Sequence, residues 1–224
     1  RALRVTWLYA GLFLPVYMLA GWYDALPVMT ILLALTIMLT LRSGWGMALA
    51  GLVAGLGGLL KLVPLAILAV TPLVTRRWRD IAIAVLVAAA VVAGVYAYAY
   101  TTGPTMTMAS LRSLTERTGW STLYALADGF LRLGKVVGDP FDPLSEVGLY
   151  DPQVPQRIVW LGWLALGAVM LFLARRRQRP PQDDWSVVAF AGFTYTVLLL
   201  AYPAWNPQYA LYLLPFLVLV WPNA

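Results

Sequence analysis

Cysteine and histidine are both absent from the 224 residues of this chain, and charged residues are scarce. The lack of cysteine excludes disulfides and thiolate metal sites, and the lack of histidine removes the commonest metal ligand and general base. The sequence therefore requires no cofactor, although it leaves open whether a divalent cation assists. Charged residues make up only 12% of the chain, against roughly 25% in soluble domains.

Long apolar segments fill most of the chain, and hydrophobic residues make up 61% of it. Several segments reach the ~20 residues that a membrane-spanning helix needs. We therefore expect an all-α fold, a polytopic transmembrane helical bundle with about six to eight membrane segments. We expect 1–224 to form a single membrane domain. The predicted segments are Val5–Ala20, Ala25–Leu41, Gly46–Val74, Ile81–Tyr100, Ile158–Ala174, Trp185–Tyr202 and Tyr209–Val220.

The segment Gly46–Val74 is too long to be one ordinary spanning helix. Its 29 residues would rise about 43 Å as an α-helix, against a hydrocarbon core of about 30 Å. Two short half-helices that break near Lys61 and Pro64 would form a hairpin and return to the same side of the membrane. We prefer the hairpin, and a single long helix is the alternative.

Arginine clusters at 76–79 and 175–179 predict the orientation of the bundle. If both are cytoplasmic and the hairpin forms, ten of the sixteen basic residues lie on the cytoplasmic side, as the positive-inside rule expects. The net charge of +6 then reflects topology and contacts with membrane lipids rather than binding to nucleic acid. We expect a multi-pass integral protein of a bacterial plasma membrane.

The same orientation makes 101–157 an extracytoplasmic loop. It carries six carboxylates and five basic residues and is therefore charge-balanced. Helical spacing of leucines over Ser110–Leu133 predicts one or two short amphipathic helices. Gly138–Pro143 is typical of turns.

Both ends of the sequence lead us to expect part of a longer protein. The chain begins at Arg1 without a methionine, and its last apolar segment has fewer than the ~17 residues usually needed to cross a bilayer.

Three short polar stretches fall on the outer face in this topology. They are Gly21–Asp24, Lys61–Pro64 and Trp205–Tyr209. Each also has a purely structural interpretation: the aromatic residues could form an interfacial belt, and Asn206-Pro207 could simply start a turn. Asp24 considered alone fits the N-cap of the helix from Ala25 better than a catalytic role.

Lys61 is harder to explain structurally, because it lies among leucines and valine, where a charge costs several kcal/mol unless it reaches water or a partner. A snorkelling lysine is the alternative to an anion contact, and we favour the anion contact. Glycines at 51, 55, 57 and 58 indicate close helix packing rather than a phosphate-cradling loop.

Several motifs carry a family resemblance. They are Asp-Ala-Leu-Pro from Asp24, Leu-Ala-Gly-Leu-Val-Ala-Gly-Leu at 49–56, Lys-Leu-Val-Pro from Lys61, Arg-Arg-Trp-Arg at 76–79, Asn-Pro-Gln-Tyr at 206–209 and Leu-Leu-Pro-Phe at 213–216. Together they resemble the polytopic GT-C glycosyltransferases, and most closely the family 87 group of polyprenol-phosphate-mannose-dependent mannosyltransferases. The resemblance implies transfer of a sugar from a polyprenyl-phosphate donor to a lipid-linked or glycan acceptor outside the cytoplasm.

This chemistry needs a cation for the leaving phosphate and a carboxylate that accepts the proton of the acceptor hydroxyl. Lys61 suits the first role. Asp24 is the best carboxylate in the chain, although the resemblance implies that the true base is an aspartate upstream of Arg1. The expected donor-binding residues are Lys61, Asn206, Gln208 and Tyr209, with Trp205, Trp22 and Tyr23 as aromatic contacts of the sugar.

Two other functions remain as alternatives. A transporter or lipid flippase would usually place ionisable residues near mid-membrane and show internal repeats. This chain has no carboxylate inside a predicted span and no visible repeat, which weakens that alternative. A non-catalytic membrane subunit is the second alternative, because no acidic first loop is visible.

Overall fold

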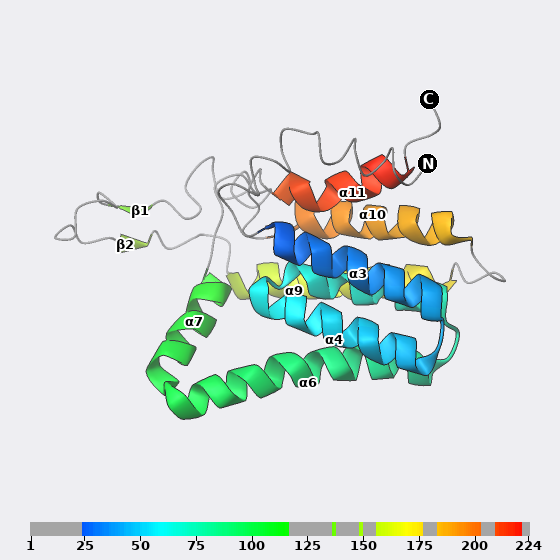
Figure 1. Cartoon of the computed structure of the whole chain (residues 1–224). Coiled ribbons are helices and arrows are strands. Elements are labelled where there is room, and N and C mark those ends of the chain that lie inside the picture. Colours follow the sequence, from blue (N-terminus) through cyan, green and yellow to red (C-terminus); the bar gives the residue numbers. More distant parts are fainter. Residues whose placement is uncertain are drawn as a thin grey trace.

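The computed structural model describes residues 24–116, 136–137, 148–149, 156–176, 183–202 and 209–220, and the account below is limited to them. Within these ranges the chain is a membrane-type bundle of apolar helices that lie side by side (Figure 1). The predicted all-α fold is therefore confirmed. A two-residue antiparallel strand pair, β1 (Val136–Val137) with β2 (Gly148–Leu149), is the one addition in the described part.

Among the described residues, two helices are long and apolar enough to cross a membrane, Trp78–Thr102 and Ile158–Arg176. The other apolar helices in the described part are shorter, at 10–17 residues. The helices of the described part are α3 (Ala25–Leu41), α4 (Gly44–Leu60), the 3-10 helix η1 (Val63–Val70), α5 (Thr71–Val74), α6 (Trp78–Thr102), α7 (Pro104–Glu116), α9 (Gln156–Arg176), α10 (Asp184–Leu200) and α11 (Ala210–Val220).

The hairpin predicted within Gly46–Val74 is confirmed. Helix α4 ends at Leu60, and the extended backbone of Lys61 (φ −154°, ψ 147°) separates it from η1. Pro64 lies in the first turn of η1, where its missing N–H leaves no hydrogen bond unmade. The returning half differs from the prediction in being mostly a 3-10 helix rather than an α-helix.

Glycines let α4 pack closely against α6 and against the returning half of the hairpin. A Cβ built on Gly51 would lie 2.3 Å from the carbonyl oxygen of Ala84 on α6, and one on Gly55 would lie 3.0 Å from that of Ala88. At the turn, a Cβ on Gly58 would lie 2.9 Å from the side chain of Leu65. The predicted role of these glycines in helix packing is thus confirmed.

Contacts between helices show which helix ends meet. Helices α4 and α6 run in the same direction, since Gly44 lies near Asp80 while Gly55 lies near Ala88. The turn at Lys61 therefore lies at the opposite end of the bundle from the loop 75–77. We call these two ends the Lys61 end and the arginine end.

Outside the bundle core, α7 turns away from the end of α6 (Figure 1). The helix expected within Ser110–Leu133 thus begins six residues earlier than predicted, at Pro104. Helices α6 and α9 also extend into the predicted loop 101–157, to Thr102 and from Gln156. The predicted span Val5–Ala20 and the turns at 138–143 lie outside the described residues.

Candidate functional site at the Lys61 end

The turn between α4 and η1 presents Lys61 at the rim of the bundle. Its backbone N–H still donates to the carbonyl of Gly57 (3.0 Å) and so ends α4, while its side chain is 25% exposed. Tyr195 of α10 fixes the start of η1, because its buried hydroxyl lies 3.3 Å from the carbonyl oxygens of Val63 and Pro64. Lys61 is therefore held on a packed turn rather than on a free loop.

The ammonium group of Lys61 forms an ion pair with Asp24, which precedes α3. The same carboxylate oxygen, Oδ1, accepts a hydrogen bond of 2.7 Å from the hydroxyl of Tyr212 on α11. Asp24 is 1% exposed, so this carboxylate is buried. A buried carboxylate needs a cation and hydrogen bonds to offset its lost hydration, and Lys61 and Tyr212 supply them.

The predicted N-cap role of the Asp24 side chain is wrong. Asp24 occupies the N-cap position of α3, but its side chain makes no capping hydrogen bond and its backbone is helical (φ −63°, ψ −19°). The side chain turns instead toward Lys61 and Tyr212. Its second oxygen, Oδ2, is buried, and none of the described residues donates a hydrogen bond to it.

Aromatic rings extend from this ion pair to helix α9. The ammonium of Lys61 lies 5.0 Å from the ring centroid of Tyr209, within the distance of a cation–π contact. Tyr209 makes edge contacts of 5.8 Å with both Tyr212 and Tyr202. Tyr202 in turn meets Trp160 and Trp163 at 5.8 Å each. Tyr209 is only 6% exposed, so the interfacial-belt interpretation is wrong for this residue, and Tyr202 beside it is buried as well.

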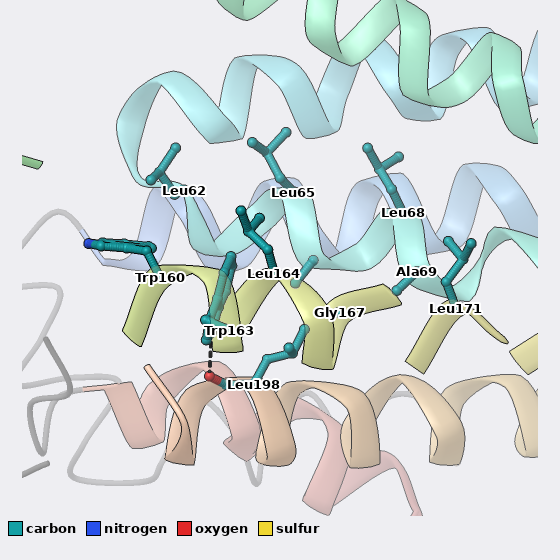
Figure 2. Close-up of a pocket in the computed structure, with 11 residues that line it drawn as sticks. Leu62, Leu65, Leu68, Ala69, Trp160, Trp163, Leu164, Gly167, Leu171 and Leu198 are labelled. Atoms are coloured by element: carbon teal, nitrogen blue, oxygen red, sulfur yellow. Dashed lines mark hydrogen bonds between the residues drawn. The ribbon is translucent and has the colours of Figure 1, made fainter. Parts of the chain in front are cut away.

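An apolar groove begins beside Lys61. It has a volume of about 480 Å³ and lies between η1 and α9, with one residue from α10 (Figure 2). Trp163 is fixed in its wall, since its indole N–H donates to the carbonyl of Leu198 (2.8 Å). That carbonyl belongs to the last turn of α10, where carbonyls lack helical partners. The groove is lined by Leu62, Leu65, Ala66, Leu68, Ala69, Trp160, Trp163, Leu164, Gly167, Leu171 and Leu198.

The arginine end is organised differently. Arg42 pairs with Asp184, which joins α3 to α10. The guanidinium of Arg175 lies 3.6 Å from the ring centroid of Trp78 and joins α9 to α6. Asp183 caps α10 by accepting from the backbone N–H of Ser186 (3.0 Å), and its hydrogen bonds to Ser186 lower the pKa of the Asp183 carboxyl below its ordinary value. Arg42, Arg79 and Arg175 thus lie at the same end of the bundle, as expected if these three belong to the ten basic residues predicted on one side.

The structure brings together three of the residues predicted from the sequence, namely Asp24, Lys61 and Tyr209. Their predicted roles in binding and catalysis stay predictions. The remaining predicted site residues lie outside the described residues, and they are Trp22, Tyr23, Trp205, Asn206 and Gln208.

Sequence reasoning missed Tyr212, Trp160 and Trp163. One signal for Tyr212 was available: it lies three residues after Tyr209, which directly precedes α11, so both side chains point to the same side at the start of this helix. For the two tryptophans, their spacing of three on α9 likewise indicated a shared face, but nothing showed which helix that face contacts.

This arrangement suits one chemical task, the binding of an anion that carries an apolar tail. Lysine has three N–H donors, and Asp24 uses one of them. The ion pair holds the cation in place, and the apolar groove starts at the next residue, Leu62.

Comparison with curated proteins and with solved structures found no match. The model of glycosyltransferase family 87, in contrast, matches residues 2–203. This match covers most of the chain and favours the glycosyltransferase prediction over the transporter alternative. The chain belongs to glycosyltransferase family 87, and it is a membrane glycosyltransferase.

Proposed function

We propose that this glycosyltransferase takes a hexose, mannose by its resemblance to the mannosyltransferases, from a polyprenyl-phosphate donor and transfers it to a lipid-linked or glycan acceptor. The observation that carries the proposal is the ion pair of the buried Asp24 with the partly exposed Lys61, which lies beside an apolar groove. A lipid-phosphate donor needs a cation at headgroup level and apolar surface next to it. A water-soluble nucleotide-sugar donor would have no use for the groove.

We place this reaction on the non-cytoplasmic face of a multi-pass protein. The arginine end carries Arg42, Arg79 and Arg175, and cytoplasmic ends are enriched in arginine. The Lys61 end then opens on the other side, where 101–157 would form the extracytoplasmic loop.

In the transfer step, a hydroxyl oxygen of the acceptor forms a bond to the anomeric carbon of the sugar. The bond from that carbon to the phosphate oxygen breaks, and the polyprenyl phosphate leaves with the electron pair. The phosphate gains negative charge as it leaves, and Lys61 stabilises that charge. Groups placed where charge develops contribute most to lowering such a barrier, and removing one typically costs about 10²–10³-fold in kcat.

Asp24 serves in this proposal as a positioning residue for Lys61. Its Oδ1 is occupied by two donors from the protein, which suits a counterion better than a group that must collect a proton. Tyr212 fixes the carboxylate from the other side. The base that takes the proton of the acceptor hydroxyl is then a different carboxylate.

The test is sugar transfer by the full chain in membranes with a polyprenyl-phosphate hexose as donor. Lys61→Ala should abolish transfer while the protein still inserts into the membrane at wild-type level. Wild-type turnover in Lys61→Ala would remove Lys61 from the phosphate site. Transfer from a nucleotide sugar without any lipid donor would refute the donor class.

Asp24→Asn separates the two roles of the carboxylate. As a positioning residue, its loss should raise the KM for the donor more than it lowers kcat, because the neutral asparagine still accepts from Tyr212 but no longer holds the ammonium of Lys61 in place. A collapse of kcat at unchanged KM would identify Asp24 as the base instead.

A further inference from the structure

The groove between η1 and α9 is almost entirely apolar in its lining and runs along the returning half of the hairpin. Figure 2 shows Leu62, which precedes η1, and Leu65 and Leu68 of η1 on one side of the groove. Trp160, Trp163 and Leu171 of α9 lie on the other. Its volume of about 480 Å³ falls in the range of ~300–1,000 Å³ typical of small-molecule sites. Leu164, a lining residue, is 60% exposed, so the groove opens on the outer surface of the bundle.

The direction of the groove follows from the residues at its two ends. Leu62 and Trp160 lie at the Lys61 end, while Ala69 and Leu171 lie nearer the arginine end. The seven steps from Leu62 to Ala69 along η1 rise about 14 Å at 3-10 geometry. A linear apolar chain whose head lies at Lys61 would therefore extend from the rim toward the interior of the membrane.

The groove is continuous with the ion-pair site. Leu62 follows Lys61 directly, and the rings of Trp160 and Trp163 reach Tyr209 through Tyr202. Tyr209 lies under the Lys61 ammonium. An anion at Lys61 and an apolar chain in the groove can thus belong to one molecule.

We propose that this groove binds the isoprene units of the donor that lie nearest to its phosphate, an inference that rests on the proposed polyprenyl-phosphate donor. The acyl chains of an ordinary phospholipid are the competing occupant. A polyprenyl chain is favoured because its single tail starts directly at the phosphate, as the groove starts directly at Lys61. In a phospholipid, a glycerol unit separates the phosphate from the acyl chains, and there are two chains rather than one.

Two glycines of α9 provide a matched test. Gly167 lines the groove, whereas Gly162 lies on the exposed side of the same helix. A Cβ on either glycine would meet nothing within 4 Å, so both positions have open space where a new side chain would begin. Only Gly167→Phe puts a ring into the groove.

The probes are a long polyprenyl phosphate without sugar and an analogue with two isoprene units. Their binding to the full chain in nanodiscs is measured by competition with a polyprenyl phosphate that carries a photoreactive group in its first isoprene units. The wild-type chain and Gly162→Phe should bind the long probe more tightly than the short one. Gly167→Phe should lose about tenfold in affinity for the long probe, or about 1.4 kcal/mol, and most of its preference for length.

A second measurement covers the case in which Gly167→Phe does not fold, which its thermal unfolding would reveal. In the wild-type chain, the photoreactive probe should label peptides of η1 and α9. Three results would overturn the groove assignment: labelling elsewhere, unchanged affinity in a folded Gly167→Phe, or equal displacement of the probe by a phospholipid. If binding still depends on Lys61 in that case, the proposed donor class stands. Wild-type protein that binds neither probe would overturn the donor class as well.

Discussion

Removing the positive charge of Lys61 should destabilise the bundle more than removing the negative charge of Asp24. In Lys61→Met, a carboxylate that is 1% exposed loses its cation and has no access to water. Breaking a buried pair in this way typically costs about 3–5 kcal/mol. Because Lys61 is itself 25% exposed, we expect the lower end, about 3 kcal/mol, which corresponds to a fall of about 6–12 °C in Tm for a chain of this size.

Asp24→Asn should cost less, about 1 kcal/mol, since the exposed ammonium can turn toward water and the asparagine oxygen still accepts from Tyr212. The double variant Lys61→Met with Asp24→Asn removes both charges. Its Tm should return to within a few degrees of the wild type, because replacing a buried pair by neutral groups is often close to neutral. Transfer activity should not return, since no cation meets the phosphate.

Thermal unfolding of the wild type, the two single variants and the double variant in nanodiscs measures their stability. Sugar transfer from the lipid donor measures their activity. Equal Tm values for Lys61→Met and the wild type would refute the buried ion pair. Recovery of transfer in the double variant would refute the role of Lys61 at the phosphate.

Three further predictions concern single contacts. Tyr212→Phe removes the 2.7 Å hydrogen bond to the buried carboxylate of Asp24. It should lower stability by about 1 kcal/mol and raise the KM for the donor. An unchanged KM for the donor would show that Tyr212 does not act on the site. Gly51→Ala should lower stability by about 1–3 kcal/mol, because the added Cβ would lie 2.3 Å from the carbonyl oxygen of Ala84. Gly94→Ala is the control and should keep the wild-type Tm, because a Cβ at this position meets nothing within 4 Å. The pKa of Asp183 in the folded chain is lowered from its ordinary 3.8. The stability that Asp183 contributes is therefore present above that value and is lost as the pH falls through the folded pKa. The Tm advantage of wild type over Asp183→Asn should shrink between pH 6 and pH 3, and a constant difference would exclude this titration.

The architecture of the hairpin could be predicted from the sequence because its signals are local. Lys61 interrupts an apolar run, Pro64 follows it, and the whole segment is too long for the bilayer. The two arginine clusters then predicted which helix ends lie on the same side of the bundle. That prediction places Asp24, Lys61 and Tyr209 together at one end. The 3-10 geometry of η1 was not predicted, because spacings of three and four residues look alike in a uniformly apolar segment.

The partners of Asp24 could not be predicted, because they come from distant parts of the chain. Tyr212 is 188 residues away in the sequence, and its contact depends on how α11 is rotated about its axis. Membrane helices are apolar on nearly all sides, so their sequences give little information about which face meets which neighbour. The N-cap interpretation of Asp24 failed for the same reason, since a local preference was overridden by a tertiary ion pair.

The groove could not be predicted from the sequence either, because it forms only in the tertiary structure. Trp160, Trp163 and Gly167 of α9 line it only because α9 packs against η1. Nothing in the residues of either helix indicates that contact.

The most direct test of a lipid-phosphate site at the Lys61 end uses the absence of cysteine, because Leu62→Cys would be the only thiol in the chain. A membrane-impermeant maleimide should modify Cys at this position from the non-cytoplasmic side, and polyprenyl phosphate should slow the reaction in the chain with Lys61 but not in one with Lys61→Gln. Modification from the cytoplasmic side alone, or equal protection in both chains, would contradict the site.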